Sequence, residues 1–282
     1  MNVLIDEVDS ALIYHHTTTE GLIGILENKE IWATNIRFLN DYEELVAGLR
    51  ELESCMENVK SIYKEKSLDD IRIDFYNKLE GVIRDNVKEK DTFISSFTKT
   101  RDSLRQWMSY GKPNSSYSIG FDRKLLESND ILSISNISND VVYSLQDVEY
   151  GEWMRLRNSS SLDKIMSRVK ESNAAVAMVE LAQDALFGCC SVKSKQFSDE
   201  NEVRMIFQTK KIGKPFLKTR FRNFGGVVTP YIGAKIPSAA IKEVIVGPSV
   251  NRELSELGLS NILKKNGIDC RVSHSVCTLR QF

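Results

Sequence analysis

The sequence is poor in the residues on which small disulfide-rich and metal-binding proteins depend. Its 282 residues include only five cysteines, five prolines and three histidines. The cysteines are odd in number and widely spaced, and they form no Cys-x-x-Cys pair, which argues against a disulfide framework and against a cysteine-based zinc site. We therefore expect reduced thiols that are mostly buried.

The few histidines also argue against a catalytic metal. They are His15, His16 and His274, and adjacent residues of a strand point to opposite faces. The sequence also has no Walker-type phosphate loop and no dinucleotide-binding glycine loop. We therefore expect no metal at the functional site of this protein.

Long apolar runs and a strong net charge are absent as well. The formal net charge is -1, so no field of the whole molecule attracts nucleic acid or an anionic membrane. The first residues are acidic where a signal peptide would be basic, and no apolar stretch reaches the length of a membrane span. A hydrophobic content of 41% and a charged content of 27% are ordinary for a globular protein, which we expect in the cytoplasm.

Hydrophobic periodicity predicts an α+β fold. Apolar residues recur at helical spacing from about 41 to 91, which predicts a helical insertion, and strand-like segments surround it. No repeat or linker divides residues 1–282, which favours a single domain. The other expected strands cover 11–15, 92–98, 116–122, 242–248 and 268–276, paired strands are expected in SVKSKQF and EVRMIFQTK, and the other helices cover 102–111, about 161–187 and 252–267.

The first candidate functional segment is Tyr14-His15-His16-Thr17-Thr18, where a strand passes into a helix. Side chains at such a junction reach a cleft, and the amides of a helix N-terminus favour phosphate, so an adenylate or pyrophosphate would suit it. The alternative is that one histidine packs in the core and the other is solvated.

The second candidate is the charged trio Glu200, Glu202 and Arg204, which strand alternation places on one face. On a solvent face the trio would be an ordinary polar edge. In a cleft, a carboxylate could hold a ribose hydroxyl and stabilise an oxocarbenium-like cation. We expect Arg204 to pair with Glu200 and to leave Glu202 free, because an unpaired charge in a cleft is costly.

Between these two segments lie hydroxyls and aromatic rings that suit a flat heterocycle. Ser95-Ser96-Phe97 belongs to a predicted strand, and Trp107 and Tyr110 share one face of the helix that follows. Large side chains at helical spacing more often pack in a core, which we favour for Trp107.

The order of these motifs resembles a bacterial family known only as domain of unknown function twenty-nine seventy-one. The motifs are IYHHTTTEGLIGIL, WATNIRFLND, SFTKTRDSLRQWMSYG, YSIGFD, ENEVRMI and IKEVIVGP, from about Leu12 to Gly247. The sequence departs from the family pattern at His16, where tyrosine is common, and at Val203, where tryptophan is common.

That family in turn resembles the ADP-ribosyltransferase superfamily, which implies a split mixed or antiparallel sheet with flanking helices and NAD as a substrate. The resemblance implies that His15 holds the adenosine ribose, that an aromatic ring stacks on nicotinamide, and that Glu202 binds the nicotinamide ribose, with Glu200 as an accessory. His15 and Glu202 are then the catalytic candidates, and the candidates for binding NAD are His15, Thr17, Ser96, Phe97, Trp107, Tyr110, Glu200 and Arg204.

We expect His15 and Glu202 to face one cavity, lined by Tyr110 or Phe97, and we expect His15→Ala and Glu202→Gln to leave the fold intact. Separation of the two side chains onto opposite faces of the sheet would contradict the ADP-ribosyltransferase hypothesis. The bacterial resemblance suggests a toxin or an antiphage effector that modifies an unknown protein or nucleic acid.

Three alternatives stay open. The first is a non-catalytic nucleotide-sensing or protein-binding module, and the second is an NAD glycohydrolase. The third is a local nucleic-acid contact at 210–224, where lysines and arginines alternate with phenylalanines, although we favour a solvated basic loop there.

Overall fold

The protein is described by a computed structural model. It describes residues 12–39, 42–65, 70–111, 115–128, 130–135, 141–151, 174–209, 219–248 and 251–277. All structural statements below refer to these ranges.

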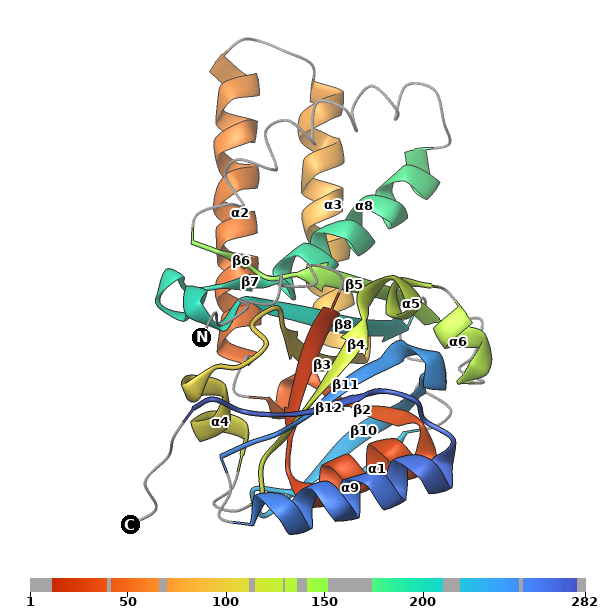
Figure 1. The fold of residues 1–282 in the computed structure, drawn as a ribbon. Coiled ribbons are helices and arrows are strands. Elements are labelled where there is room, and N and C mark those ends of the chain that lie inside the picture. Colours follow the sequence, from red (N-terminus) through yellow and green to blue (C-terminus); the bar gives the residue numbers. More distant parts are fainter. Residues whose placement is uncertain are drawn as a thin grey trace.

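A ten-stranded mixed sheet forms the centre of the molecule (Figure 1). Its main path runs β12-β11-β4-β1-β3-β2-β10-β9, and β8 adds to β3 and carries β5. Most pairs are antiparallel, whereas β11 and β12 are parallel. The strands are β1 (Leu12–Thr17), β2 (Glu30–Asn35), β3 (Thr92–Thr98), β4 (Tyr117–Asp122), β5 (Val141–Asp147), β8 (Glu202–Thr209), β9 (Arg220–Phe224), β10 (Val227–Lys235), β11 (Ile241–Val246) and β12 (Arg271–His274), and β6 (Glu149–Tyr150) with β7 (Val192–Lys193) forms a separate two-stranded ladder.

Helices cover the sheet on both faces. In Figure 1, α1 and α9 lie below the strands, whereas α2, α3 and α8 rise above them. The α-helices are α1 (Thr19–Asn28), α2 (Tyr42–Glu65), α3 (Asp70–Glu89), α4 (Leu104–Tyr110), α5 (Arg123–Glu127), α6 (Asp130–Ile134), α8 (Ala174–Cys189) and α9 (Arg252–Asn266), and short 3-10 turns are η1 (Ile36–Phe38), η2 (Lys195–Glu200) and η3 (Ser238–Ala240).

Two hydrophobic clusters hold these layers together. The first joins the sheet to α1 and α9 and includes Leu26, Phe97 and Leu263. The second joins the other face to α2, α3 and α8 and includes Ile94 and Ile206. Because strand residues alternate between faces, this division shows to which side each side chain of β3 and β8 points.

The β3 strand is the fork of the sheet. One of its edges pairs with β8 along the whole strand, from Thr92↔Gln208 to Thr98↔Glu202. Its other edge pairs with β2 near Ile94 and with β1 only at Thr98. The sheet therefore splits between β1 and β2, over the middle of β3.

The junction of β1 and α1 follows from local chemistry. Thr18 is extended and caps the helix, because its side chain accepts a hydrogen bond from the backbone N–H of Gly21. Leu22, Ile25 and Leu26 then face the core at helical spacing. The helix that the sequence predicts after the first strand is thus present, and Thr18 caps it.

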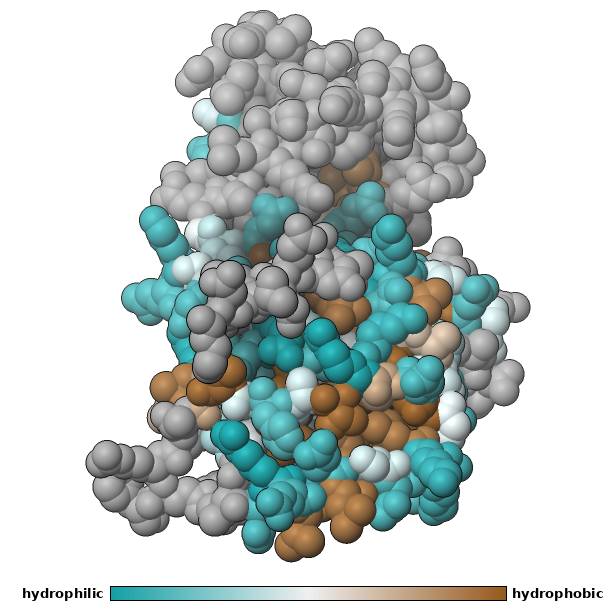
Figure 2. Space-filling view, in the orientation of Figure 1, coloured by the Kyte–Doolittle hydropathy of each residue, from teal (hydrophilic) through white to brown (hydrophobic). Residues whose placement is uncertain are grey.

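The surface in the orientation of Figure 1 is mixed (Figure 2). Hydrophobic patches occur over the lower part of the molecule, where α1 and α9 lie. The exposed apolar side chains of these helices include Ile23, Leu254 and Leu257. Among the described helices, none has the length and apolar character needed to cross a membrane.

The structure corrects one predicted strand pairing. The paired strands expected in SVKSKQF and EVRMIFQTK do not pair with each other, because η2 separates them and β7 pairs with β6 instead. Helices occupy most of the segment 41–91, where helical spacing was predicted. Residues 66–69 of this segment and the first part of the helix expected from about 161 lie outside the described residues.

Candidate functional site

His15 lies at the split of the sheet. Its Nδ1 is 2.9 Å from the backbone oxygen of Ser96, which belongs to the middle of β3. A carbonyl oxygen only accepts, so Nδ1 carries the proton and donates. The His15 ring therefore occupies the edge of β3 that lies between β1 and β2.

The environment of His15 keeps its ring neutral. Burial lowers its pKa, and the charge of Arg222 lowers it further, whereas the hydrogen bond to Ser96 acts in the opposite direction. With Nδ1 protonated, the neutral ring has an acceptor at Nε2. No described residue forms a hydrogen bond with that nitrogen. His15 can thus accept a hydrogen bond from a ligand hydroxyl.

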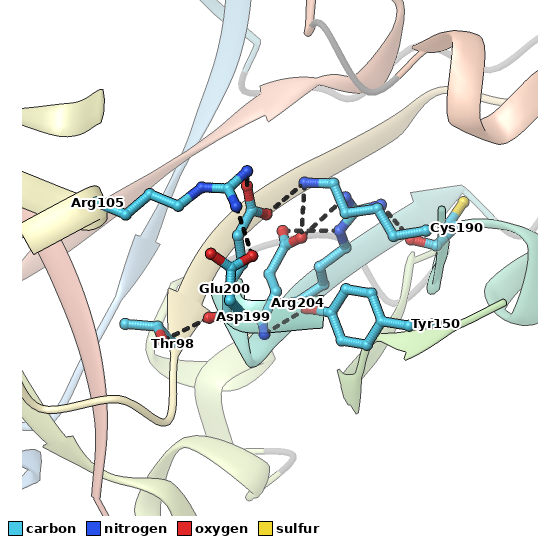
Figure 3. Close-up of polar contacts among 9 residues, drawn as sticks. Thr98, Arg105, Tyr150, Cys190, Asp199, Glu200 and Arg204 are labelled. Carbon is cyan, nitrogen blue, oxygen red and sulfur yellow. Dashed lines mark hydrogen bonds and ion pairs between the residues drawn. The ribbon is translucent and has the colours of Figure 1, made fainter. Parts of the chain in front are cut away.

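Glu202 lies in a buried network of charges at the start of β8, and Figure 3 shows its partner Arg204. Arg204 donates from Nε to Oε1 at 2.8 Å and from Nη2 to Oε2 at 3.1 Å. Lys193 donates to the same Oε2 at 3.1 Å. The Arg204 side chain is 1% exposed and that of Glu202 is 6% exposed, so water contributes little to the solvation of this pair.

The network keeps Glu202 ionised. Burial alone would raise its pKa, but the charge and hydrogen bonds of Arg204, the charge of Lys193 and a hydrogen bond with the Ser96 side chain lower it below its ordinary value. The Arg204 Nη1 also donates to the backbone oxygen of Cys190 at 2.8 Å. The carboxylate is therefore a fixed anion.

Glu200 belongs to the outer part of this network. It lies on η2, before the strand, and accepts from Lys193 at 2.8 Å and from Arg105 at 3.4 Å. Arg105 also pairs with Asp199 at 2.5 Å (Figure 3). Because Glu200 precedes β8, it is not the strand residue that alternation assumed.

The expected pairing of the trio is therefore wrong. Arg204 pairs with Glu202 and not with Glu200, so Glu202 is not the free carboxylate. Glu200 is instead shared between Lys193 and Arg105. The physical reason is the full burial of Arg204, which requires the nearest carboxylate as its partner.

Ser96 lies between His15 and Glu202. Its backbone oxygen accepts from His15, and its side chain helps to lower the pKa of Glu202. In the sheet, Ser96 is paired with Arg204. The two catalytic candidates thus meet at one residue of the strand between them.

The side chains of His15 and Glu202 lie on opposite faces of the sheet, however. His15 packs against Phe97, with ring centroids 5.5 Å apart, on the face covered by α1 and α9. Glu202 is paired with Thr98 and lies on the other face, together with Arg204. The expectation that His15 and Glu202 face one cavity is wrong, because an odd number of residues separates their register positions.

The remaining predicted site residues divide between core and surface. Trp107 is 2% exposed and donates through Nε1 to Asp102, as expected of a core residue. Tyr110 is 49% exposed, and Phe97 is 3% exposed. Thr17 lies against the first turn of α1, because its Oγ1 is 2.0 Å from the place that a Cβ on Gly21 would take.

The sequence did not indicate Lys193 as a site residue, and it placed Arg222 only in the basic segment 210–224, not near His15. Lys193 belongs to a two-residue strand, too short to be detected by periodicity. Arg222 follows His15 by 207 positions in the chain, and only the tertiary fold brings its charge near that ring. No local pattern signals either contact.

The fold and the network define a mixed α/β protein with a forked sheet and a buried ionic centre at the fork. The family described as "Protein of unknown function (DUF2971)" matches residues 106–205. The match includes Trp107, Tyr110, Glu200, Glu202 and Arg204, and it supports the predicted resemblance to that family. Searches of curated proteins and of solved structures give no match.

Proposed function

We propose that the chain is a nucleotide-binding module that binds NAD without turnover, at a site centred on the His15 ring. One observation carries the proposal: Nδ1 of the neutral His15 ring donates to the Ser96 carbonyl, and no described residue forms a hydrogen bond with Nε2. His15 and Glu202 lie on opposite faces of the sheet, which counts against an ADP-ribosyltransferase that uses both side chains.

Binding asks for a hydrogen-bond acceptor beside the ligand. Nε2 of His15 would accept a hydrogen bond from a ribose hydroxyl of NAD. Transfer of ADP-ribose would also require the ionised Glu202 to stabilise the oxocarbenium-like cation that forms when the glycosidic bond breaks and nicotinamide leaves with the electron pair. Because Glu202 lies on the other face of the sheet, one NAD at His15 would not meet it.

Glu202 has little capacity left for a ligand. Its oxygens already accept from Arg204 and Lys193, which uses most of the acceptor capacity of a carboxylate. Glu202 is therefore a structural anion beside the site, and His15 is the residue that would contact the nucleotide.

Equilibrium dialysis with NAD tests the proposal, together with an assay of nicotinamide release. We expect the wild-type protein to bind NAD and to release no nicotinamide, and we expect His15→Ala to lose binding. Ser96→Ala keeps the carbonyl that holds His15 and should keep binding.

His274→Ala is the matched control, because His274 lies on the edge strand β12 and, among the described residues, its ring forms a hydrogen bond only with the exposed Glu256. Equal NAD binding by His15→Ala and by the control would overturn the proposed site. Release of nicotinamide without any macromolecular acceptor would favour an NAD glycohydrolase.

An NAD-dependent ADP-ribosyltransferase is the second candidate, and the split of the sheet between β1 and β2 favours it. Such an enzyme would release nicotinamide when a protein or nucleic-acid acceptor is added, which would fit a toxin or defence effector. Glu202 would then have to act without His15.

A further inference from the structure

A face of the sheet away from α1 and α9 carries a row of aromatic rings and guanidinium groups. We call it the cation–aromatic face, and it consists of Trp32 on β2, Tyr231 on β10, and Arg220, Arg222 and Phe224 on β9. These side chains share one face because Tyr231 is paired with Arg220 in one ladder and with Thr34 in the other, and Trp32 is two residues from Thr34. The opposite side of β2 and β10 contributes Ile31 and Ile232 to the core under α1 and α9.

The members of this face contact one another in an alternating order. The Arg220 guanidinium lies 4.9 Å from the centroid of Tyr231, whose ring lies 4.5 Å from Trp32. Arg222 lies 5.3 Å from Trp32 and 5.3 Å from Phe224. These distances are within the range of cation–π interactions.

Two of the three rings remain open to solvent in spite of these contacts, whereas Tyr231 is buried. Trp32 is 41% exposed and Phe224 is 51% exposed. Phe221 and Val227, in the same hairpin, are also exposed. Solvent-exposed aromatic surface of this extent, next to cations, is typical of a binding surface.

Arg222 is the least satisfied cation of the face. Among the described residues its only hydrogen-bond partner is Thr34, which accepts from Nη2 at 2.7 Å. Its Nε is buried without a partner in that part of the chain, and no described carboxylate pairs with it. A partly buried guanidinium without an anion can accept a phosphate.

The charge of the face is positive. Glu30 is the one carboxylate that the described residues bring to it, and it pairs with Arg220 and with Lys235. Three cations, Arg220, Arg222 and Lys235, therefore stand against the single carboxylate of Glu30. Gly233 makes room for the Arg220–Glu30 pair, because a Cβ there would lie 1.8 Å from Nη2 of Arg220.

We propose that the cation–aromatic face binds single-stranded nucleic acid, with bases stacked on Trp32 and Phe224 and backbone phosphates on Arg222 and Arg220. Exposed rings beside cations are the two components of such sites, and unpaired bases have the free faces that the rings require. The expected solvated basic loop at 210–224 is corrected in part, because Arg220–Phe224 form a strand. Residues 210–218 lie outside the described ranges.

The nucleic-acid proposal goes beyond the proposed NAD site and does not depend on it, so its test contains no NAD. A fluorescently labelled twelve-nucleotide oligothymidylate is titrated with protein at several salt concentrations, and anisotropy gives the affinity. We expect Arg222→Gln to weaken binding about fivefold or more and to reduce the salt slope by about 0.7, as for the loss of one phosphate contact on a single strand. Arg222→Lys should keep the slope.

Lys264→Gln is the matched control, because Lys264 belongs to α9 on the other side of the sheet. Trp32 supplies a second readout. Its exposed indole should be quenched when a base stacks on it, whereas Trp107 is buried, and Trp32→Phe should abolish that quenching while the anisotropy signal persists.

Four results would overturn the proposal. They are the absence of oligonucleotide binding by the wild-type protein at low salt, equal effects of Arg222→Gln and Lys264→Gln, equal affinity for a duplex of the same length, and binding without a change in Trp32 emission. Circular dichroism melting of each variant shows whether the fold is retained. If Arg222→Gln does not fold, Arg220→Gln replaces it, because Arg220 is half-exposed.

Discussion

Replacement of Glu202 by glutamine should strongly destabilise the protein. The substitution keeps the size of the side chain but removes the charge that Arg204 and Lys193 share. Arg204 would retain its bond to the Cys190 carbonyl, and Lys193 would retain Glu200. Removing one partner of a buried ion pair costs about 3–5 kcal/mol, and these remaining partners favour the lower end of that range.

Urea unfolding followed by circular dichroism at pH 7 measures this cost. The matched control is Glu200→Gln, since Glu200 is more exposed and lies in the outer part of the network, and we expect it to lose only about 1 kcal/mol. A double variant, Glu202→Gln with Arg204→Met, should recover part of the loss, because it leaves no unpaired guanidinium.

The pH dependence provides an independent check. The pKa of Glu202 is lowered in the folded state, so its contribution to stability is present above the ordinary value of 4.5 and is lost as the pH falls through the folded-state pKa. The difference between the wild-type protein and Glu202→Gln should therefore shrink below about pH 4.5. A loss of less than about 1 kcal/mol at pH 7, equal to that of Glu200→Gln, would refute the assignment of Glu202 as a buried structural anion. The initial expectation that Glu202→Gln leaves the fold intact would then hold.

Three further substitutions test other parts of the fold. His16→Phe should remove a pH dependence of stability. Burial lowers the pKa of His16 to about 3, so stability that is present above pH 6.5 is lost as the pH falls from 6.5 toward 3, by on the order of 2 kcal/mol at pH 5. Unfolding curves at pH 5 and 7 measure this loss. Equal pH dependence in both proteins would count against the neutral, unpaired ring. Gly233→Ala should displace the Arg220–Glu30 pair and cost about 1 kcal/mol in urea unfolding, and an unchanged midpoint would contradict the close approach. Asp102→Ala should cost about 2–3 kcal/mol and alter Trp107 fluorescence, because Asp102 accepts from Trp107, Ser275 and Val276, and a spectrum like that of the wild-type protein would exclude this contact.

Sequence patterns located most of the elements that carry the site. The β-branched and aromatic run at 92–98 and the capped helix after Thr18 have local causes, and both are present with the expected bounds or nearly so. The strands Val141–Asp147 and Val227–Lys235 were not predicted. The second contains Pro230 and follows two glycines, which weakens a strand signal.

The arrangement of the candidate site was harder to predict than its residues. Alternation along a strand is a local rule, and it failed for Glu200 because a 3-10 turn extends up to that residue. The faces of His15 and Glu202 depend on the register of three strands that are far apart in the sequence. Register is fixed by the packing of the whole sheet, which no single segment encodes.

The fork of the sheet also depends on strand register and not on a local sequence pattern. Thr98 pairs with Tyr14 on one side and with Glu202 on the other, and only this three-strand contact brings Ser96 between the two candidates. The residue types at 95–97 indicated a polar strand near a ligand. They did not indicate that a backbone carbonyl would hold the His15 ring.

Nitrogen NMR of the imidazole rings during a titration with NAD tests the central claim most directly, because the chain has only three histidines. Without NAD, the His15 ring should be neutral with its proton on Nδ1. The account predicts that NAD shifts the Nε2 signal of His15, that His274 does not respond, and that Ser96→Ala preserves the tautomer. A titration in which His15 keeps its shift, or in which only His274 responds, would contradict a nucleotide site at the fork of the sheet.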